Sequence, residues 1–153
     1  MKRAGFVTAF VLATTISGAA FAAEEAKNLV EYRWSVMTAF GGHAAAIAKV
    51  VKGEVPYTDQ VSGHAAAIAI TAPMIRDIFP KGSGPDAFAD TDALPAIWDK
   101  PDAFKKAQDD FVVAADEFAE AAKSDDRKTV LVGFKKLGDA CGACHQDFRR
   151  EKK

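Results

Sequence analysis

Cysteine is scarce in this chain: only two of the 153 residues are cysteine, and both lie in one C-x-x-C segment. A disulfide between residues this close would close a very small loop and stabilise the fold little. A structural zinc site is also unexpected, because it needs four ligands and the chain has no second cysteine pair. The rarity of cysteine therefore excludes a disulfide scaffold and a zinc-ribbon domain.

An excess of one charge is absent as well. The formal net charge is −1 and 49% of the residues are hydrophobic. The chain lacks the excess of basic residues that is typical of nucleic-acid-binding proteins, and it is too apolar for a disordered chain. Its length suits one globular domain. We recognise no nucleophile–base pair and no carboxylate dyad, so we do not expect an enzyme.

Long apolar runs are missing, except at the start of the chain. Residues 4–20 follow the basic Met1-Lys2-Arg3 and end at Ala20-Phe21-Ala22, a small-x-small pattern typical of signal-peptide cleavage. The alternative is a retained membrane anchor, for which the run is marginal in length. We interpret 1–22 as a cleaved signal peptide and 23–153 as one mature domain. That domain is expected in a bacterial periplasm, without stable insertion in a membrane.

Strand signals are missing too, since period-two alternation is not found. Apolar spacing of three and four residues instead predicts four amphipathic helices. Two short connections and one long one, residues 80–100, join them, which is typical of an all-α four-helix bundle. The first, second and fourth expected helices span about 25–52, 58–79 and 126–150. The third begins near residues 99–101 and ends at the break formed by residues 124–126.

Several local signals set the expected helix ends. Gly53 can adopt a left-handed C-cap after the first helix, and Pro56 prevents its continuation. Thr58 and Asp59 are candidate N-caps of the second helix. Pro73 should kink that helix or mark a break in it.

The two cysteines stand in Cys141-Gly-Ala-Cys144-His145, the C-x-x-C-H spacing of covalent haem attachment. Thiols three residues apart lie on one side of a helix, where both can form thioethers to one porphyrin. His145 would then be the proximal iron ligand. Both cysteines lie on the inward stripe of the last predicted helix, so we expect one haem c inside the bundle. A thioredoxin-like pair would need a βαβ context, which the pattern does not offer.

The second axial ligand of the iron must come from an earlier helix. The candidates are Met37, His43, His64 and Met74. Met37 lies on the inward stripe of the first helix, although a methionine there is more often core packing. His43 and His64 are more typical of surface or edge histidines. The residues alone leave this ligand open.

Arg33 precedes Met37 by four residues and shares its inward face. A buried cation needs a partner, and haem propionates would supply one. The alternative is that Arg33 extends along the surface to solvent.

One phrase, His-Ala-Ala-Ala-Ile-Ala, occurs at residues 43–48 and again at 64–69. No wider repeat surrounds it. We interpret it as two alanine-rich helix faces that allow close approach, and not as a repeat architecture.

The chain resembles the class II c-type cytochromes, the family of cytochrome c′ and cytochrome c-556. The resemblance covers essentially the whole mature chain, and the late position of the haem motif distinguishes this family from class I cytochromes. The matching segments are Cys141-Gly-Ala-Cys144-His145, Phe148-Arg149, Tyr32-Arg33-x-x-x-Met37, Gly41-Gly42-His43, Lys52-Gly53-Glu54-Val55-Pro56, Phe79-Pro80 and Pro95-x-Ile97-Trp98.

The resemblance implies an up-down-up-down bundle with one covalent haem. Cys141 and Cys144 match the thioether positions, and His145 matches the proximal ligand. Arg33 and Trp34 match positions that line the haem in the family.

The resemblance also implies two functions that differ at Met37. This position is the sixth ligand in the low-spin c-556 type, which would make the chain a one-electron carrier. In the high-spin c′ type, methionine at this position can leave the iron five-coordinate and open to nitric oxide or carbon monoxide. A redox partner protein and a homodimer are further expectations. A basic region could steer the partner or simply stabilise a helix end; it comprises Lys135, Lys136, Arg149, Arg150, Lys152 and Lys153.

Overall fold

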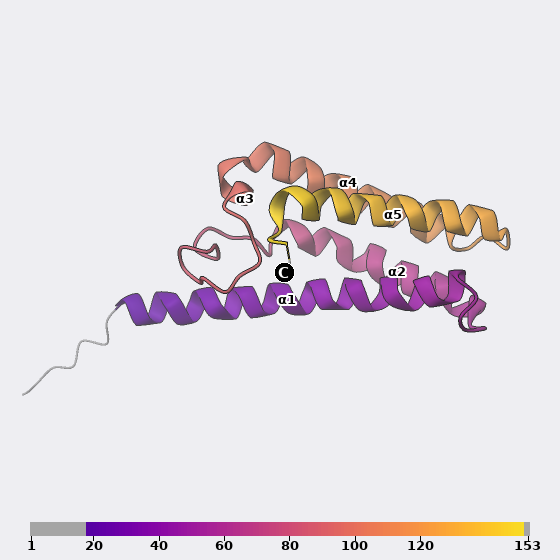
Figure 1. Ribbon diagram of the computed structural model, residues 1–153, viewed down its shortest axis with the longest axis horizontal. Coiled ribbons are helices and arrows are strands. Elements are labelled where there is room, and N and C mark those ends of the chain that lie inside the picture. Colours follow the sequence, from indigo (N-terminus) through magenta and orange to yellow (C-terminus); the bar gives the residue numbers. More distant parts are fainter. Residues whose placement is uncertain (1–17, 152–153) are drawn as a thin grey trace, which may run out of the picture.

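The computed structural model describes residues 18–151 and consists almost entirely of helices (Figure 1). Four long helices form an antiparallel bundle, as expected, and a long loop with one short helix closes one end of it. Within the described residues the only β pairing is an isolated bridge between Ala93 and Arg149. The elements are α1 (Gly18–Val51), η1 (Thr58–Gln60), α2 (Val61–Thr71), η2 (Ala72–Arg76), α3 (Ala96–Asp99), α4 (Pro101–Ala121) and α5 (Arg127–Phe148).

The first helix is longer than expected, because α1 begins at Gly18 and not near residue 25. Most of the predicted signal peptide, residues 1–17, lies outside the described residues. Its last residues, 18–22, belong to the first turns of α1. Cleavage after Ala22 would leave α1 beginning at Ala23, and this cleavage stays a prediction.

Glycine and proline end the helices where the sequence indicated. Gly53 has a φ of 78° and follows the last turn of α1, where Glu54 N donates to Lys49 O over 2.9 Å. Pro73 lies in η2, so the second predicted helix changes from α to 3-10 geometry at this point. Pro101 is the first residue of α4, where its missing N–H costs nothing.

The N-cap prediction for the second helix was wrong. Thr58 and Asp59 form the separate turn η1, and α2 starts after Gln60 without a side-chain cap. α5, by contrast, has a strong cap. Asp126 accepts hydrogen bonds from the backbone N–H groups of Lys128 and Thr129.

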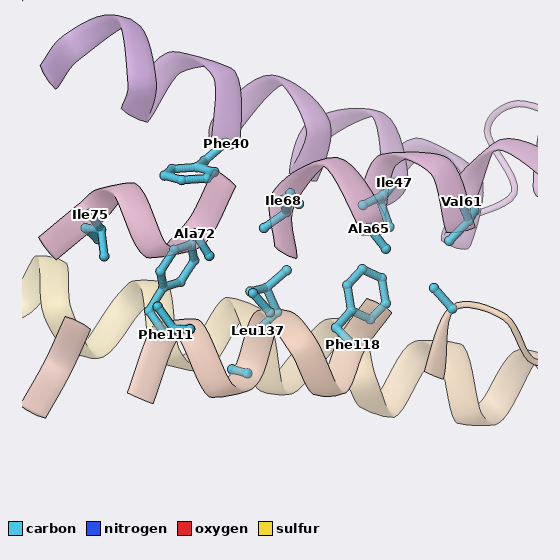
Figure 2. Packing of buried hydrophobic residues seen from close by; sticks show 14 of the residues in the cluster. Phe40, Ile47, Val61, Ala65, Ile68, Ala72, Ile75, Phe111, Phe118 and Leu137 are labelled. Atoms are coloured by element: carbon cyan, nitrogen blue, oxygen red, sulfur yellow. The ribbon is translucent and has the colours of Figure 1, made fainter. Parts of the chain in front are cut away.

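The main hydrophobic core runs between the four long helices (Figure 2). Ile47 from α1, Ile68 from α2, Phe118 from α4 and Leu137 from α5 are its largest fully buried side chains. α4 and α5 approach closely at Gly133, where a Cβ would lie 2.8 Å from Ala121 Cβ. This close contact lies in the first half of α5, away from the lining of the cavity described below.

A second, smaller cluster lies at the loop end of the bundle. It consists of Ala93, Ile97, Phe104 and Phe148, from the loop, α3, α4 and α5. The ring of Phe104 makes edge contacts with Phe79 and Phe148, at centroid distances of 4.9 and 5.0 Å.

Among residues 18–151, none of the helices combines the length and the apolar character that a membrane span requires.

Candidate haem site

A cavity of about 620 Å³ separates the two hydrophobic clusters. Residues of α1 form one side and residues of α5 form another, while α2, α4 and the long loop close the remainder. Its walls are mainly apolar, and its volume lies within the usual range of cofactor pockets. The lining residues from the main core are Phe40, Ile68, Ile75, Phe111 and Leu137, and those from the end cluster are Ala93, Ile97, Phe104 and Phe148.

The α5 wall carries the C-x-x-C-H motif. Cys141, Cys144 and His145 all line the cavity and are half-buried. Both cysteines are free thiols, because the structure contains no disulfide between them. Since α5 continues to Phe148, the three side chains project from one regular helical surface. The predicted grouping of these residues in the bundle interior is therefore present in the fold.

Burial shifts the pKa values of all three side chains on this wall. Burial raises the pKa of the Cys141 thiol. Burial, followed by the charges of Cys141 and Asp147, raises the pKa of Cys144 to about 11. Burial and then the charge of Arg149 lower the pKa of His145, which favours the neutral imidazole that binds iron. Protonated thiols are poor redox nucleophiles, so a thioredoxin-like role does not fit.

Met37 lies on the α1 wall of the same cavity and is half-buried. The other candidates for the sixth position do not line it. Met74 is 44% exposed on η2. His43 and His64 contact each other, with their Nδ1 atoms 2.9 Å apart. Met37 is thus the one candidate that shares the cavity with His145.

Arg33 also lines the cavity, but it is only 3% exposed and does not extend to solvent. Its guanidinium donates four hydrogen bonds to the long loop and lies 4.7 Å from the centroid of the Phe79 ring. Nη1 donates to Ile78 O and Ser83 Oγ, at 3.3 and 3.0 Å. Nη2 donates to Ser83 O and Thr91 Oγ1, at 2.9 and 2.7 Å. The surface alternative considered for Arg33 was therefore wrong.

All the partners of Arg33 are neutral, so no carboxylate of the described residues compensates its charge. Burial lowers the pKa of Arg33 to about 10, which still leaves it charged at neutral pH. A buried, uncompensated cation at a cavity wall suits a cofactor that carries carboxylates. This unpaired charge is a feature that haem propionates would complement.

Trp34 lies at the edge of the cavity and is 37% exposed. Its ring makes an edge contact with Phe88 of the long loop, at a centroid distance of 6.2 Å. The family resemblance placed Trp34 beside the haem, and the fold places it at the boundary between cavity and solvent.

The chain segment after α5 is tied to the long loop. Leu94 N donates to Phe148 O over 3.0 Å, and Arg150 N donates to Asp92 O over 2.7 Å. Arg149, Asp92 and Thr91 line the cavity as a result. The sequence analysis missed the roles of Thr91 and Asp92, because their positions depend on contacts with distant segments and no local motif marks them.

The donor set fits a haem better than a metal ion held by side chains alone. Among the described residues, no three His, Cys, Asp or Glu side chains form a metal-binding group. Two thiols and an imidazole instead face a large apolar cavity, and a buried guanidinium lines the same cavity. Both features match what a covalently bound porphyrin with propionates requires.

Comparisons with known proteins agree with this fit. Residues 28–149 match the family model described as Cytochrome C'. The chain is 36% identical over 151 residues to cytochrome c' of Rhodospirillum rubrum, covering 99% of this chain and 100% of that protein. It is 33% identical over 153 residues to cytochrome c-556 of Agrobacterium fabrum, covering 99% of each.

A solved structure shares the fold as well. The TM-score is 0.74 against a nitric oxide complex of a cytochrome c prime variant from Alcaligenes xylosoxidans, at 27% identity, with 83% of this chain and 97% of that chain covered. On these grounds the chain belongs to the cytochrome c' family of helical-bundle proteins, whose cofactor is one covalently attached c-type haem.

Proposed function

We propose that this protein is a periplasmic one-electron carrier with a six-coordinate haem. Cys141 and Cys144 would form the thioethers, His145 would be the proximal ligand and Met37 the sixth ligand. The observation that supports this assignment is the position of Met37, the only one of the four candidates that lines the cavity with His145. Bound haem would supply an iron that accepts and releases one electron, and no substrate is turned over.

The protein's own residues would tune this exchange. The apolar walls exclude water, and a dry site favours the less charged ferrous state. Arg33 is held rigidly by four hydrogen bonds and contributes a positive charge beside the cavity. A fixed cation favours the reduced form, since reduction removes one positive charge from the iron. The chain would therefore stabilise the ferrous state through burial and through Arg33.

The test is the visible spectrum of the mature holoprotein with and without Met37. We expect low-spin bands in the ferric wild type and a weak band near the red end from sulfur ligation. Met37→Leu, which keeps the volume of the side chain, should convert the spectrum to high spin. Met74→Leu is the matched control and should leave it unchanged. A low-spin spectrum that survives Met37→Leu would contradict the assignment.

The second candidate function is binding of nitric oxide or carbon monoxide at a five-coordinate haem. It is supported by the apolar cavity and by the likeness to a cytochrome c prime solved with nitric oxide bound. A high-spin ferric spectrum of the wild type, together with rapid carbon monoxide binding by the ferrous form, would favour this function over electron transfer.

The sequence left open whether the basic region around α5 steers an acidic redox partner or only stabilises a helix end. Two of its six residues are paired in the structure: Lys135 contacts Asp139 over 2.6 Å, and Lys136 contacts Glu117 over 3.3 Å. Lys152 and Lys153 lie outside the described residues. Arg149 remains exposed at the cavity. We propose that a redox partner approaches here, beside the cavity that would hold the haem. We also propose a homodimer, which sedimentation of the mature protein tests.

A further inference from the structure

The proposed function leaves His43 and His64 without a role. The two imidazoles come from α1 and α2, and their Nδ1 atoms lie 2.9 Å apart. Their ring centroids are 5.2 Å apart and the rings are tilted by 55°. Neither residue lines the haem cavity. They therefore form a separate pair of imidazoles, held by two packed helices.

The repeated phrase explains how the two residues meet. α1 and α2 run antiparallel and side by side (Figure 1). Each phrase begins with its histidine, and its isoleucine enters the main core, where Ile47 and Ile68 are buried (Figure 2). The buried isoleucines fix the rotation of each helix, and this rotation turns both histidines to the shared α1–α2 seam. The pair is thus positioned by the core.

The surroundings of the pair contain little that could compete for the imidazoles. No charged residue occurs between Arg33 and Lys49 on α1, or between Asp59 and Arg76 around α2. Each imidazole is hydrogen-bonded only to the other. Both side chains are half-buried, so solvent reaches them. Nothing in the hydrogen bonding of the described residues would have to break apart from this one contact.

The separation of the two nitrogens is close to that of neighbouring ligands on one metal ion. Two nitrogens bound about 2.0 Å from an ion, at roughly 90° to 109°, lie about 2.8 to 3.3 Å apart. In the structure the Nδ1 atoms face each other, so the Nδ1–H of one imidazole donates a hydrogen bond to Nδ1 of the other. The imidazole that donates would shift its proton from Nδ1 to Nε2 through solvent. Once the rings turn toward a common point, both neutral imidazoles could then bind the ion through Nδ1.

We propose that His43 and His64 form an open binding site for a late first-row transition-metal ion, with Cu²⁺ bound most tightly. Imidazole is a preferred ligand of these ions, and affinity for a given site generally peaks at Cu²⁺. No third His, Cys, Asp or Glu joins the pair in the described part of the chain, so water completes the coordination. Such a site takes up and releases its ion readily, unlike a closed structural site.

Titration of the ferric holoprotein with CuCl₂ in a non-coordinating buffer tests this site. We expect calorimetry to show one stoichiometric equivalent per chain, and electron paramagnetic resonance to show nitrogen ligation of the copper. His43→Gln and His64→Gln should each weaken this equivalent by about tenfold or more, because each removes one of two ligands. The haem bands should not change during the titration, since the site lies outside the cavity.

Asp59→Asn is the matched control, because Asp59 is the acidic residue closest before His64 in the sequence. It should bind Cu²⁺ like the wild type. An unaltered visible spectrum in each variant shows that the bundle is intact. The site is refuted if the wild type takes up no stoichiometric Cu²⁺, or if both glutamine variants bind it as tightly as the wild type.

Discussion

At the scale of single residues, Arg33 shows how one side chain organises the cavity. Its four hydrogen bonds reach Ile78, Ser83 and Thr91, which span the long loop. Thr91 Oγ1 also accepts from Ala93 N over 3.2 Å. One buried cation thus fixes the loop that closes the cavity, and it supplies charge to the same cavity. The two roles predict different consequences of its removal.

Arg33→Met should reduce the free energy of unfolding by about 3 kcal/mol or more, because buried carbonyl and hydroxyl groups lose their donor. It should also lower the reduction potential. Urea denaturation and a spectroelectrochemical titration of the holoprotein measure the two effects. Lys49→Met removes an exposed cation from the same helix and should change the free energy by about 0.5 kcal/mol or less. Equal losses in both variants would contradict the role of Arg33.

At the scale of elements, the sequence predicted best what depends on neighbouring residues. Gly53, Pro73 and Pro101 shape the chain through their own backbone preferences, and the structure follows each of them. The C-x-x-C-H motif likewise depends only on spacing along one helix.

What the sequence could not supply is long-range pairing. The partners of Arg33 lie 45 to 58 residues away, and those partners sit in an irregular loop without periodicity. The contact of His43 with His64 depends on the relative shift of two helices, which the buried isoleucines set only after packing. The N-cap prediction at Thr58 failed although a suitable capping residue was present, because Thr58–Gln60 form the separate turn η1 and α2 starts at Val61.

The cap of α5 gives a prediction on pH. Hydrogen bonds from the Thr129 side chain and from the backbone of Lys128 and Thr129 hold the pKa of Asp126 below its usual value. The folded-state pKa is depressed, so the stabilisation is complete above the unfolded value of about 3.9 and is lost as pH falls through the folded pKa. Asp126→Ala should lower Tm at pH 7, and the difference from the wild type should shrink below about pH 4.

Thermal unfolding monitored by circular dichroism between pH 3 and pH 7 checks this dependence. Asp125→Ala, at the exposed neighbouring position, is the control and should show little effect at any pH. A Tm difference for Asp126→Ala that is constant over the whole range would show that charge on Asp126 does not contribute.

At the scale of the whole molecule, the haem cavity divides the interior in two. The main core and the end cluster lie on either side of it, and several of its lining residues belong to each. The cofactor would therefore complete the apolar interior as well as provide the chemistry. Its loss should affect the two clusters unequally, since α4 and α5 also pack directly against each other at Gly133, outside the cavity lining.

A Cys141→Ala/Cys144→Ala chain isolated without haem should unfold at a much lower urea concentration than the holoprotein, because the cavity of about 620 Å³ is left without its apolar filling. Hydrogen exchange should accelerate most around Phe104 and Phe148 and least around Gly133. Haem added back should restore part of the stability, since it binds only the folded state. A haem-free chain as stable as the holoprotein would contradict this view of the interior.

The exposed part of the cavity lining has one more consequence, which concerns access to the haem. Most of the lining is buried or half-buried, so solvent meets the cavity mainly where its lining is exposed. The exposed residues of the lining mark the opening of the cavity; they are Trp34, Thr38, Gly41 and Arg149. An electron from a docked protein, or a dissolved gas, would therefore enter beside the Trp34 indole and the Arg149 guanidinium.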